Sequence, residues 1–136
     1  MKNKTLHLDY IKRSENRLAA LDVLFERESW PDVVRESQEI VELSLKALLR
    51  AFGIEVPRIH DVGDILESQR SLLNKSSKAE LAKMADISSQ LRRDRELAFY
   101  GSEDLTPSEF YKKKHAEEAR KNAQWVVVQV KKAVLG

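Results

Sequence analysis

The stretch PDVVRESQEIVELSLKALLRAF, residues 31–52, decides the fold of this chain. Its charged residues recur at three- and four-residue steps and form a narrow stripe along a helix: Arg35, Glu39, Glu42, Lys46 and Arg50. Apolar side chains cover much of the remaining circumference: Val33, Val34, Ile40, Val41, Leu45, Leu48 and Phe52. A helix that is apolar over so much of its girth packs in the middle of a bundle, so we expect this segment to be the central helix.

Helical spacing on both sides of this segment predicts four more helices. The first spans about residues 5–28, and a shorter one spans about residues 61–73 after an extended connector. The fourth begins after a loop over residues 74–77, in which either Ser76 or Ser77 could be the cap, and stops at Gly101. The last begins at Thr106-Pro107-Ser108-Glu109, a capping box with proline in the first turn, and should continue unbroken to about residue 134. The sequence therefore predicts an all-α fold, an antiparallel up-and-down bundle of four long helices plus one shorter helix, in a single domain over residues 1–136.

The composition limits what the chain can do. Charged residues make up 34% of its 136 residues, but the formal net charge is only +2, so any preference for a polyanion must come from a local patch. The absence of cysteine excludes disulfides, thiolate zinc sites and a cysteine nucleophile. The N-terminal residues contain no apolar signal-peptide core, and no apolar run approaches the ~18 residues of a membrane span. We expect a soluble, cytoplasmic protein and predict no cofactor.

Residues 91–101, LRRDRELAFYG, place three arginines near the end of the fourth predicted helix. At about 100° of rotation per residue, Arg95 falls inside an apolar stripe formed by Leu81, Met84, Ile87, Leu91 and Ala98. A guanidinium is costly to bury alone, so Arg95 needs a phosphate, a carboxylate or carbonyl groups beside it. Arg92 and Phe99 flank it, which puts cations beside an aromatic ring, a surface suited to phosphate and base. A buried ion pair with an acid of a neighbouring helix is the competing interpretation.

A second basic cluster, Lys112-Lys113-Lys114 followed by His115, lies near the start of the last predicted helix. Only a short loop separates it from the arginine run, so the two clusters should lie near each other. Lysines at a helix N-terminus oppose the helix dipole, a small cost that fits a site recruiting anions. A solvated helix face without a binding role is the alternative.

Motifs for metal or hydrolytic chemistry are weak in this sequence. His60-Asp61 resembles the His-Asp pair of metal phosphohydrolases, but such sites need further histidines, and His7 and His115 have nothing around them at ligand spacing. We therefore interpret Asp61 as a helix N-cap and predict no metal site. The chain has neither a glycine-rich phosphate loop nor a Gly-x-Ser-x-Gly nucleophile elbow.

Three blocks of this sequence resemble the HEPN domain, a family of small helical proteins. The first contains Tyr10, Arg13-Ser14 and Arg17-Leu18. The second runs over residues 35–49 and continues through residues 53–54, 57 and 60–62. The third is residues 91–101. Together they span nearly the whole chain, and the middle block is the most specific.

The resemblance implies a helical bundle that forms a homodimer and is often encoded beside a minimal nucleotidyltransferase, as a toxin–antitoxin or related pair. Many such proteins are metal-independent ribonucleases whose signature is Arg, four to six residues, then His, facing a dimer cleft. Here four residues separate Arg95 from Tyr100 and six separate Arg93 from it, and Tyr100 stands where the histidine would be. A tyrosine with an ordinary pKa of about 10 is a poor base at neutral pH, although it can donate a hydrogen bond to phosphate or stack on a base. On a continuous helix Arg95 and Tyr100 point about 140° apart, so they would converge only if the last turn unwinds or across a dimer.

Two functions are compatible with these observations. In the first, a homodimer binds nucleotide or RNA phosphate and acts with a nucleotidyltransferase partner. Its binding residues are Arg92, Arg93, Arg95, Phe99, Lys112, Lys113 and Lys114, and Arg95 and Tyr100 are the catalytic pair if RNA is cleaved. In the second, the chain is a catalytically inert interaction module whose arginines pair with acids such as Glu39 or Glu42 of the central helix.

Overall fold

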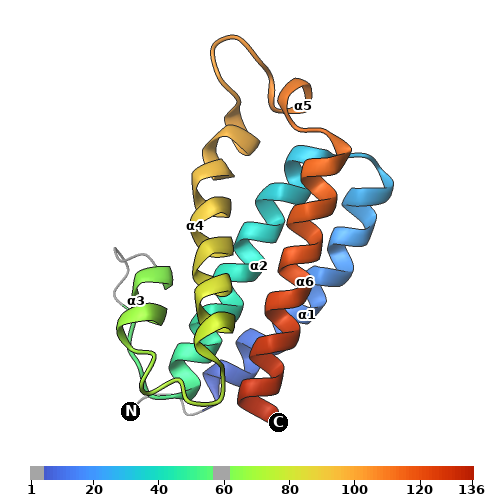
Figure 1. Cartoon of the computed structure of the whole chain (residues 1–136). Helices are drawn as coiled ribbons and strands as arrows, with labels where there is room; N and C mark the ends of the chain where they lie inside the picture. The colour runs from blue at the N-terminus through green and yellow to red at the C-terminus, as the bar shows by residue number, and fades with distance from the viewer. Residues whose placement is uncertain (1–4, 57–61) are drawn as a thin grey trace.

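The computed structural model describes residues 5–56 and 62–136, apart from the side chains of residues 95–97 and 99. In these ranges the chain forms six helices and no strand. They are α1 (Leu6–Glu26), α2 (Trp30–Ala51), α3 (Val62–Ser68), α4 (Lys78–Tyr100), α5 (Pro107–Phe110) and α6 (Lys113–Leu135) (Figure 1). The predicted all-α fold is confirmed, whereas the antiparallel up-and-down order and the single domain stay predictions.

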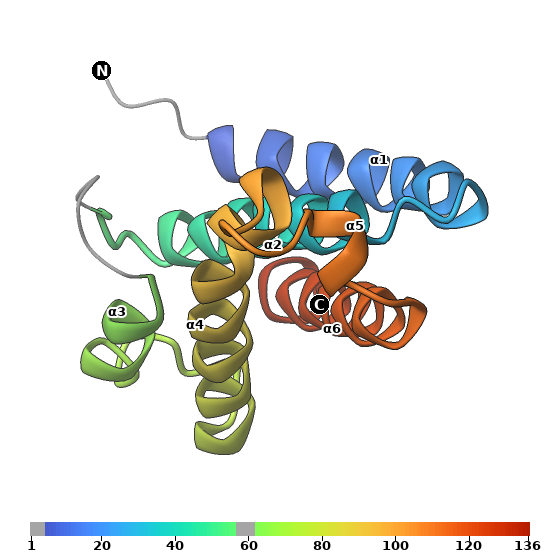
Figure 2. The ribbon, with the colours of Figure 1, turned by 90° about the horizontal axis from the view of Figure 1, so that it is seen from above.

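Helix α2 is central, as its apolar girth predicts. It packs against α1, α4 and α6, and Figure 2 shows it between α1 on one side and α4 and α6 on the other. Ile40, Leu45, Leu48 and Leu49 of α2 are fully buried. Burial of each such side chain stabilises the fold by about 1.5–3 kcal/mol, so α2 supplies a large share of the apolar core.

Local sequence signals set the ends of α4. A capping box starts it: the Glu80 N–H donates to Ser77 Oγ at 3.1 Å, and the Ser77 N–H donates to Glu80 Oε1 at 3.0 Å. Gly101 ends it with a φ of 82°, in the left-handed region that favours glycine. A Cβ at this position would lie 2.7 Å from the Leu105 carbonyl oxygen, so no other residue fits without a shift of the backbone.

The prediction for the third helix is only partly right. The α-helix ends at Ser68, and residues 70–73 instead form turns in which the Leu73 N–H donates to the Arg70 carbonyl. These turns let Leu73 reach the core, where it is almost fully buried. Asp61, the predicted cap, and its neighbour His60 lie outside the described residues.

The prediction of one unbroken helix over residues 106–134 is wrong. The Thr106–Glu109 capping box is present, but α5 lasts only four residues, and Tyr111 and Lys112 adopt extended backbone before α6 begins. The break turns the Tyr111 side chain into the core, where it is 2% exposed and its hydroxyl donates to the Asp94 carbonyl oxygen at 3.1 Å. The break removes helical hydrogen bonds, each of which contributes ~1 kcal/mol to stability. Burial of the Tyr111 ring contributes more than any one of these bonds.

Tyr111 should make the stability of the fold sensitive to alkaline pH. Burial, followed by the charge and hydrogen bonding of Asp94, raises the pKa of Tyr111 to about 12. The unfolded chain loses this proton near pH 10 and the folded chain retains it, so the free energy of unfolding should fall by about 1–3 kcal/mol between these two values. Tyr111→Phe should lack this fall and should be about 1 kcal/mol less stable at neutral pH. Denaturant unfolding followed by circular dichroism at several pH values measures both effects, and parallel pH curves for the two proteins would contradict the assignment.

Candidate phosphate-binding site

The end of α4 carries the arginines that the sequence singles out. Its predicted apolar stripe is confirmed, because all five members are buried: Leu81, Met84, Ile87, Leu91 and Ala98. Arg92 and Arg93 are exposed, and Arg93 Nη1 lies 3.4 Å from the Ser89 hydroxyl. Tyr100, at the last helical position, is 77% exposed. The side chains of Arg95 and Phe99 lie outside the described part of the chain.

Arg92 and Asp94 face opposite flanks of α4. On one flank, burial alone would raise the pKa of Glu42 on α2, but the hydrogen bond from Gln38 and the charges of Lys46 and Arg92 outweigh it and lower that pKa. Arg92 therefore lies close to the charged stripe of α2. On the other flank Asp94 lines a cleft between α4 and α6, so Arg92 and Asp94 lie on different faces of the helix.

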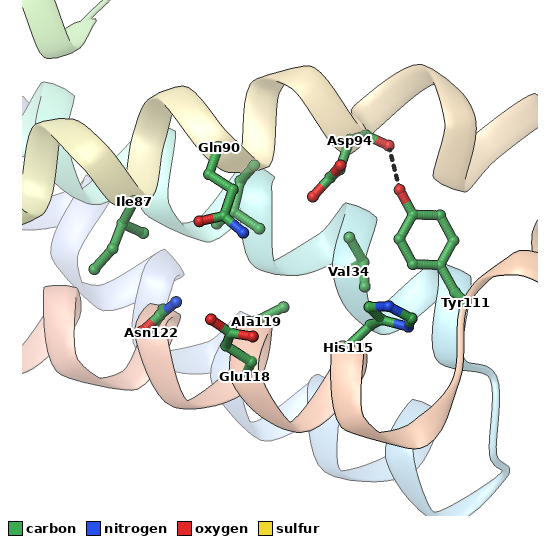
Figure 3. A pocket seen from close by; sticks show the side chains of 10 residues that line it. Val34, Ile87, Gln90, Asp94, Tyr111, His115, Glu118, Ala119 and Asn122 are labelled. Carbon is green, nitrogen blue, oxygen red and sulfur yellow. Dashed lines mark hydrogen bonds between the residues drawn. The ribbon is translucent and has the colours of Figure 1, made fainter.

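A small cleft with a polar rim separates α4 from α6 (Figure 3). Its volume is about 40 Å³, enough for a few water molecules at ~10–15 Å³ each, so it is too small for a nucleotide. The rim consists of Gln90, Asp94, Tyr111, His115, Glu118 and Asn122. Burial raises the pKa of Asp94, and Arg93, Tyr111 and His115 offset this only in part.

The break between α5 and α6 places the three lysines beside the end of α4. Tyr111, directly before Lys112, is hydrogen-bonded to Asp94, directly after Arg93. Lys112, Lys113 and Lys114 are all exposed, and Lys113 forms an ion pair with Glu117 at 3.9 Å. This contact agrees with the predicted nearness of the two basic clusters.

His115 has a structural role that the sequence reasoning missed. Its Nδ1 accepts a hydrogen bond from the Lys112 N–H at 2.9 Å, and its ring stacks on Phe110 with centroids 6.0 Å apart. Nδ1 accepts this bond through its lone pair, so in the neutral ring the proton is on Nε2. Neither ring nitrogen is then free to accept a further proton. His115 occupies the third helical position of α6, where a side-chain acceptor commonly completes a capping box, but the predicted unbroken helix from Thr106 placed it in a helix interior and hid this role.

The described residues contain no cluster of three side chains placed to hold a metal ion. None of the described helices is long and apolar enough to cross a membrane. The site is instead the basic end of one helix in an all-helical protein, with exposed arginines on α4 and lysines at the start of α6 beside it.

The family model of the HEPN domain matches residues 7–133, nearly the whole chain. The protein therefore belongs to the HEPN domain family, and the resemblance seen in the sequence is confirmed. A search among curated proteins found no match.

Two substitutions at His115 test its capping role. Both His115→Gln and His115→Ala remove the ring contacts, but glutamine can still accept the Lys112 N–H bond. We expect His115→Ala to be about 0.5–1 kcal/mol less stable than His115→Gln, with faster amide hydrogen exchange at Lys112. Denaturant unfolding and exchange detected by NMR measure the difference. Identical behaviour of the two variants would show that the hydrogen bond contributes nothing.

Proposed function

We propose that this HEPN protein binds the phosphate groups of RNA or of a nucleotide at the end of α4. The observation that carries the proposal is the hydrogen bond from Tyr111 to Asp94, because it holds Lys112, Lys113 and Lys114 beside the last turns of α4. These lysines are exposed, as are Arg92 and Arg93. Exposed arginine and lysine side chains bind phosphate through direct charge–charge contact and the release of counterions, even where the net charge of the whole chain is only +2.

Arg95, Phe99 and Tyr100 complete the proposed site. In this proposal Arg95 contacts a phosphate oxygen, and the two aromatic side chains stack on bases or, for Tyr100, donate a hydrogen bond to phosphate. The exposure of Tyr100 supports this role. The described part of α4 remains helical through Tyr100, so Arg95 and Tyr100 would converge only across a dimer.

Binding rather than rapid cleavage is the proposed main activity. If RNA is cleaved, the arginines stabilise the negative charge that develops on the phosphorus-bound oxygens. No histidine follows Arg95 at the family spacing, and Nδ1 of His115 is already engaged. The lack of a general base typically costs ~10²–10⁴ in rate, so any ribonuclease activity should be slow and independent of metal.

The family also suggests the setting in which this protein acts. HEPN proteins often form dimers. We propose a cytoplasmic homodimer that acts with a minimal nucleotidyltransferase, in a toxin–antitoxin-like pair.

A second function, an inert interaction module, is favoured by one observation. The charge of Arg92 acts on Glu42, as expected if the arginines of α4 neutralise the acids of α2. In that case the arginines hold the helices together and bind no ligand.

RNA binding by charge-removing variants tests the proposed function. Arg95→Ala should weaken binding of a short single-stranded RNA by about tenfold or more, because it removes a charge-assisted hydrogen bond. Replacing the three lysines 112–114 by alanine should make the slope of log affinity against log salt concentration less steep, by about 0.7 for each phosphate that is no longer neutralised. Fluorescence anisotropy at several salt concentrations measures both, and Arg70→Ala, at an exposed position after α3, is the matched control. Wild-type affinity in both variants would refute phosphate binding at this end of α4.

A thermal melt of Arg95→Ala, run beside a metal-free ribonuclease assay, separates the two functions. If Arg95 binds a ligand, the variant should melt like the wild type and lose RNA binding together with any cleavage. If Arg95 neutralises a buried carboxylate, its removal should cost about 3–5 kcal/mol and lower the melting temperature clearly. A collapsed melt would therefore favour the interaction module.

A further inference from the structure

The cleft between α4 and α6 carries polar groups that the proposed phosphate contacts do not use. In Figure 3 the side chains of Gln90 and Asp94 from α4, and of Glu118 and Asn122 from α6, extend into the space between the two helices. Two of these groups are carboxylates and two are amides, so the cleft offers both acceptors and donors of hydrogen bonds. Its volume of about 40 Å³ admits the polar edge of a base whose ring stays outside, although a whole nucleotide does not fit.

The Asp94 carboxylate lacks a strong partner in this cleft. It is half-buried, and no ion pair joins it to a residue of the described ranges. Burial raises the pKa of Asp94, and the charge of Glu118 adds to this rise. A ligand that donates hydrogen bonds to the carboxylate would offset both effects. The described residues place no group of three metal ligands here, so N–H donors of an organic ligand suit the cleft better than a metal ion does.

The geometry of α4 matches one RNA base in particular. Guanine alone presents two adjacent donors on its Watson–Crick edge, N1–H and the N2 amino group, with the acceptor O6 beside them. A single carboxylate accepts both donors at once. Gln90 lies one helical turn before Asp94, so their Cβ atoms are about 5–6 Å apart on the same side of α4. The Gln90 amide can therefore donate to O6 while Asp94 accepts from N1 and N2.

We propose that the cleft between α4 and α6 binds the Watson–Crick edge of guanine, with Asp94 as the acceptor and Gln90 as the donor to O6. This inference names the base of the proposed ligand, so it rests on the proposed function. Tyr111 donates a hydrogen bond to the Asp94 carbonyl and directly precedes Lys112, so a phosphate on the lysines lies next to the cleft. Glu118, exposed on the rim, disfavours bases that present an acceptor there.

An aromatic surface borders the cleft at its lysine end. Phe110 is 39% exposed, and its ring stacks on His115, which lines the cleft, with the two planes 15° apart. The buried Tyr111 supports Phe110 from the side, with ring centroids 4.9 Å apart. A guanine whose edge enters the cleft can stack its ring on this surface. Stacking accepts any base, so it adds affinity, whereas the contact with Asp94 supplies the selectivity.

Single-base changes in a short RNA test the inferred preference. The probe is a labelled single-stranded oligouridine with guanosine, inosine, adenosine or uridine at its centre. Inosine lacks only the N2 amino group of guanosine, so this pair isolates one of the two donors. We expect the guanosine RNA to bind about fivefold or more tightly than each of the other three. Fluorescence anisotropy at one fixed salt concentration measures this difference, because phosphate contacts respond to salt and are common to all four probes.

Variants of the cleft assign the preference to its residues. Asp94→Asn replaces one acceptor oxygen by a donor, so it should weaken binding of the guanosine RNA by about fivefold or more and leave the uridine RNA unaffected. Its thermal melt should not fall, because burial already disfavours the charged carboxylate. Gln90→Ala changes an exposed position and should reduce the same preference without affecting folding. Asp86→Asn, at another exposed position of α4, is the matched control and should keep the wild-type preference.

The outcomes distinguish this inference from the proposed function. Equal affinity of the wild type for all four RNAs overturns guanine binding and leaves the proposed phosphate binding intact. A guanosine preference that survives in both Asp94→Asn and Gln90→Ala overturns the assignment to this cleft.

Absence of binding to every RNA refutes the proposed function, and guanosine without a phosphate then tests the cleft by itself. Guanosine should shift the NMR signals of the Gln90 and Asn122 side-chain amides, whereas adenosine should not. Unchanged amide signals with guanosine would overturn the inference.

Discussion

The burial of α2 on all sides but one is the constraint on which the rest of this structure depends. The helices α1, α4 and α6 each pack on α2, and they pack less extensively on one another. A helix enclosed in this way must be apolar around most of its circumference, and its charged residues must gather where no neighbour covers it. The open side therefore carries Glu39, Glu42 and Lys46, and the same constraint that builds the core also gathers these charges on the outer side of α2.

Helical periodicity was sufficient to predict much of this fold. The long helices, the apolar stripe of α4 and the capping boxes at Ser77 and Thr106 depend on residues within one or two turns of each other, so spacing alone indicates them. The break at Tyr111 depends on a contact with Asp94, 17 residues earlier in the chain. The residues around Tyr111 are compatible with a continuous helix, and only the tertiary burial of its ring favours the extended conformation. Local patterns cannot predict such a break.

In the candidate site, too, the sequence predicted the features that depend on local spacing and not those that depend on tertiary contacts. The sequence indicated which residue types gather near the end of α4, and the structure agrees that the lysines lie beside it. The sequence could not indicate that Arg92 faces α2 while Asp94 faces α6. Periodicity gives the direction of a side chain around its own helix, but which neighbour lies in that direction depends on how the helices pack. The role of His115 was hidden for a different reason, since the segment looked like the interior of a helix rather than its first turn. Once the break at Tyr111 is known, the acceptor at the third helical position follows from ordinary capping.

The charged residues at the end of α4 differ in their pairing from those on the outer side of α2. At the end of α4 the exposed arginines and lysines lie among acids such as Asp94 and Glu117, so the proposed phosphate binding depends on direct contacts from individual cations and not on a large excess of positive charge. Over α2, Arg17 pairs with Glu36 and Lys46 pairs with Glu42, so these cations are already partly neutralised and a polyanion would gain little there. In the proposed function, Tyr100 stands where many family members carry a histidine, and a tyrosine is a poor proton acceptor at neutral pH but can still contact phosphate or a base, so binding is expected to depend less on this position than cleavage does.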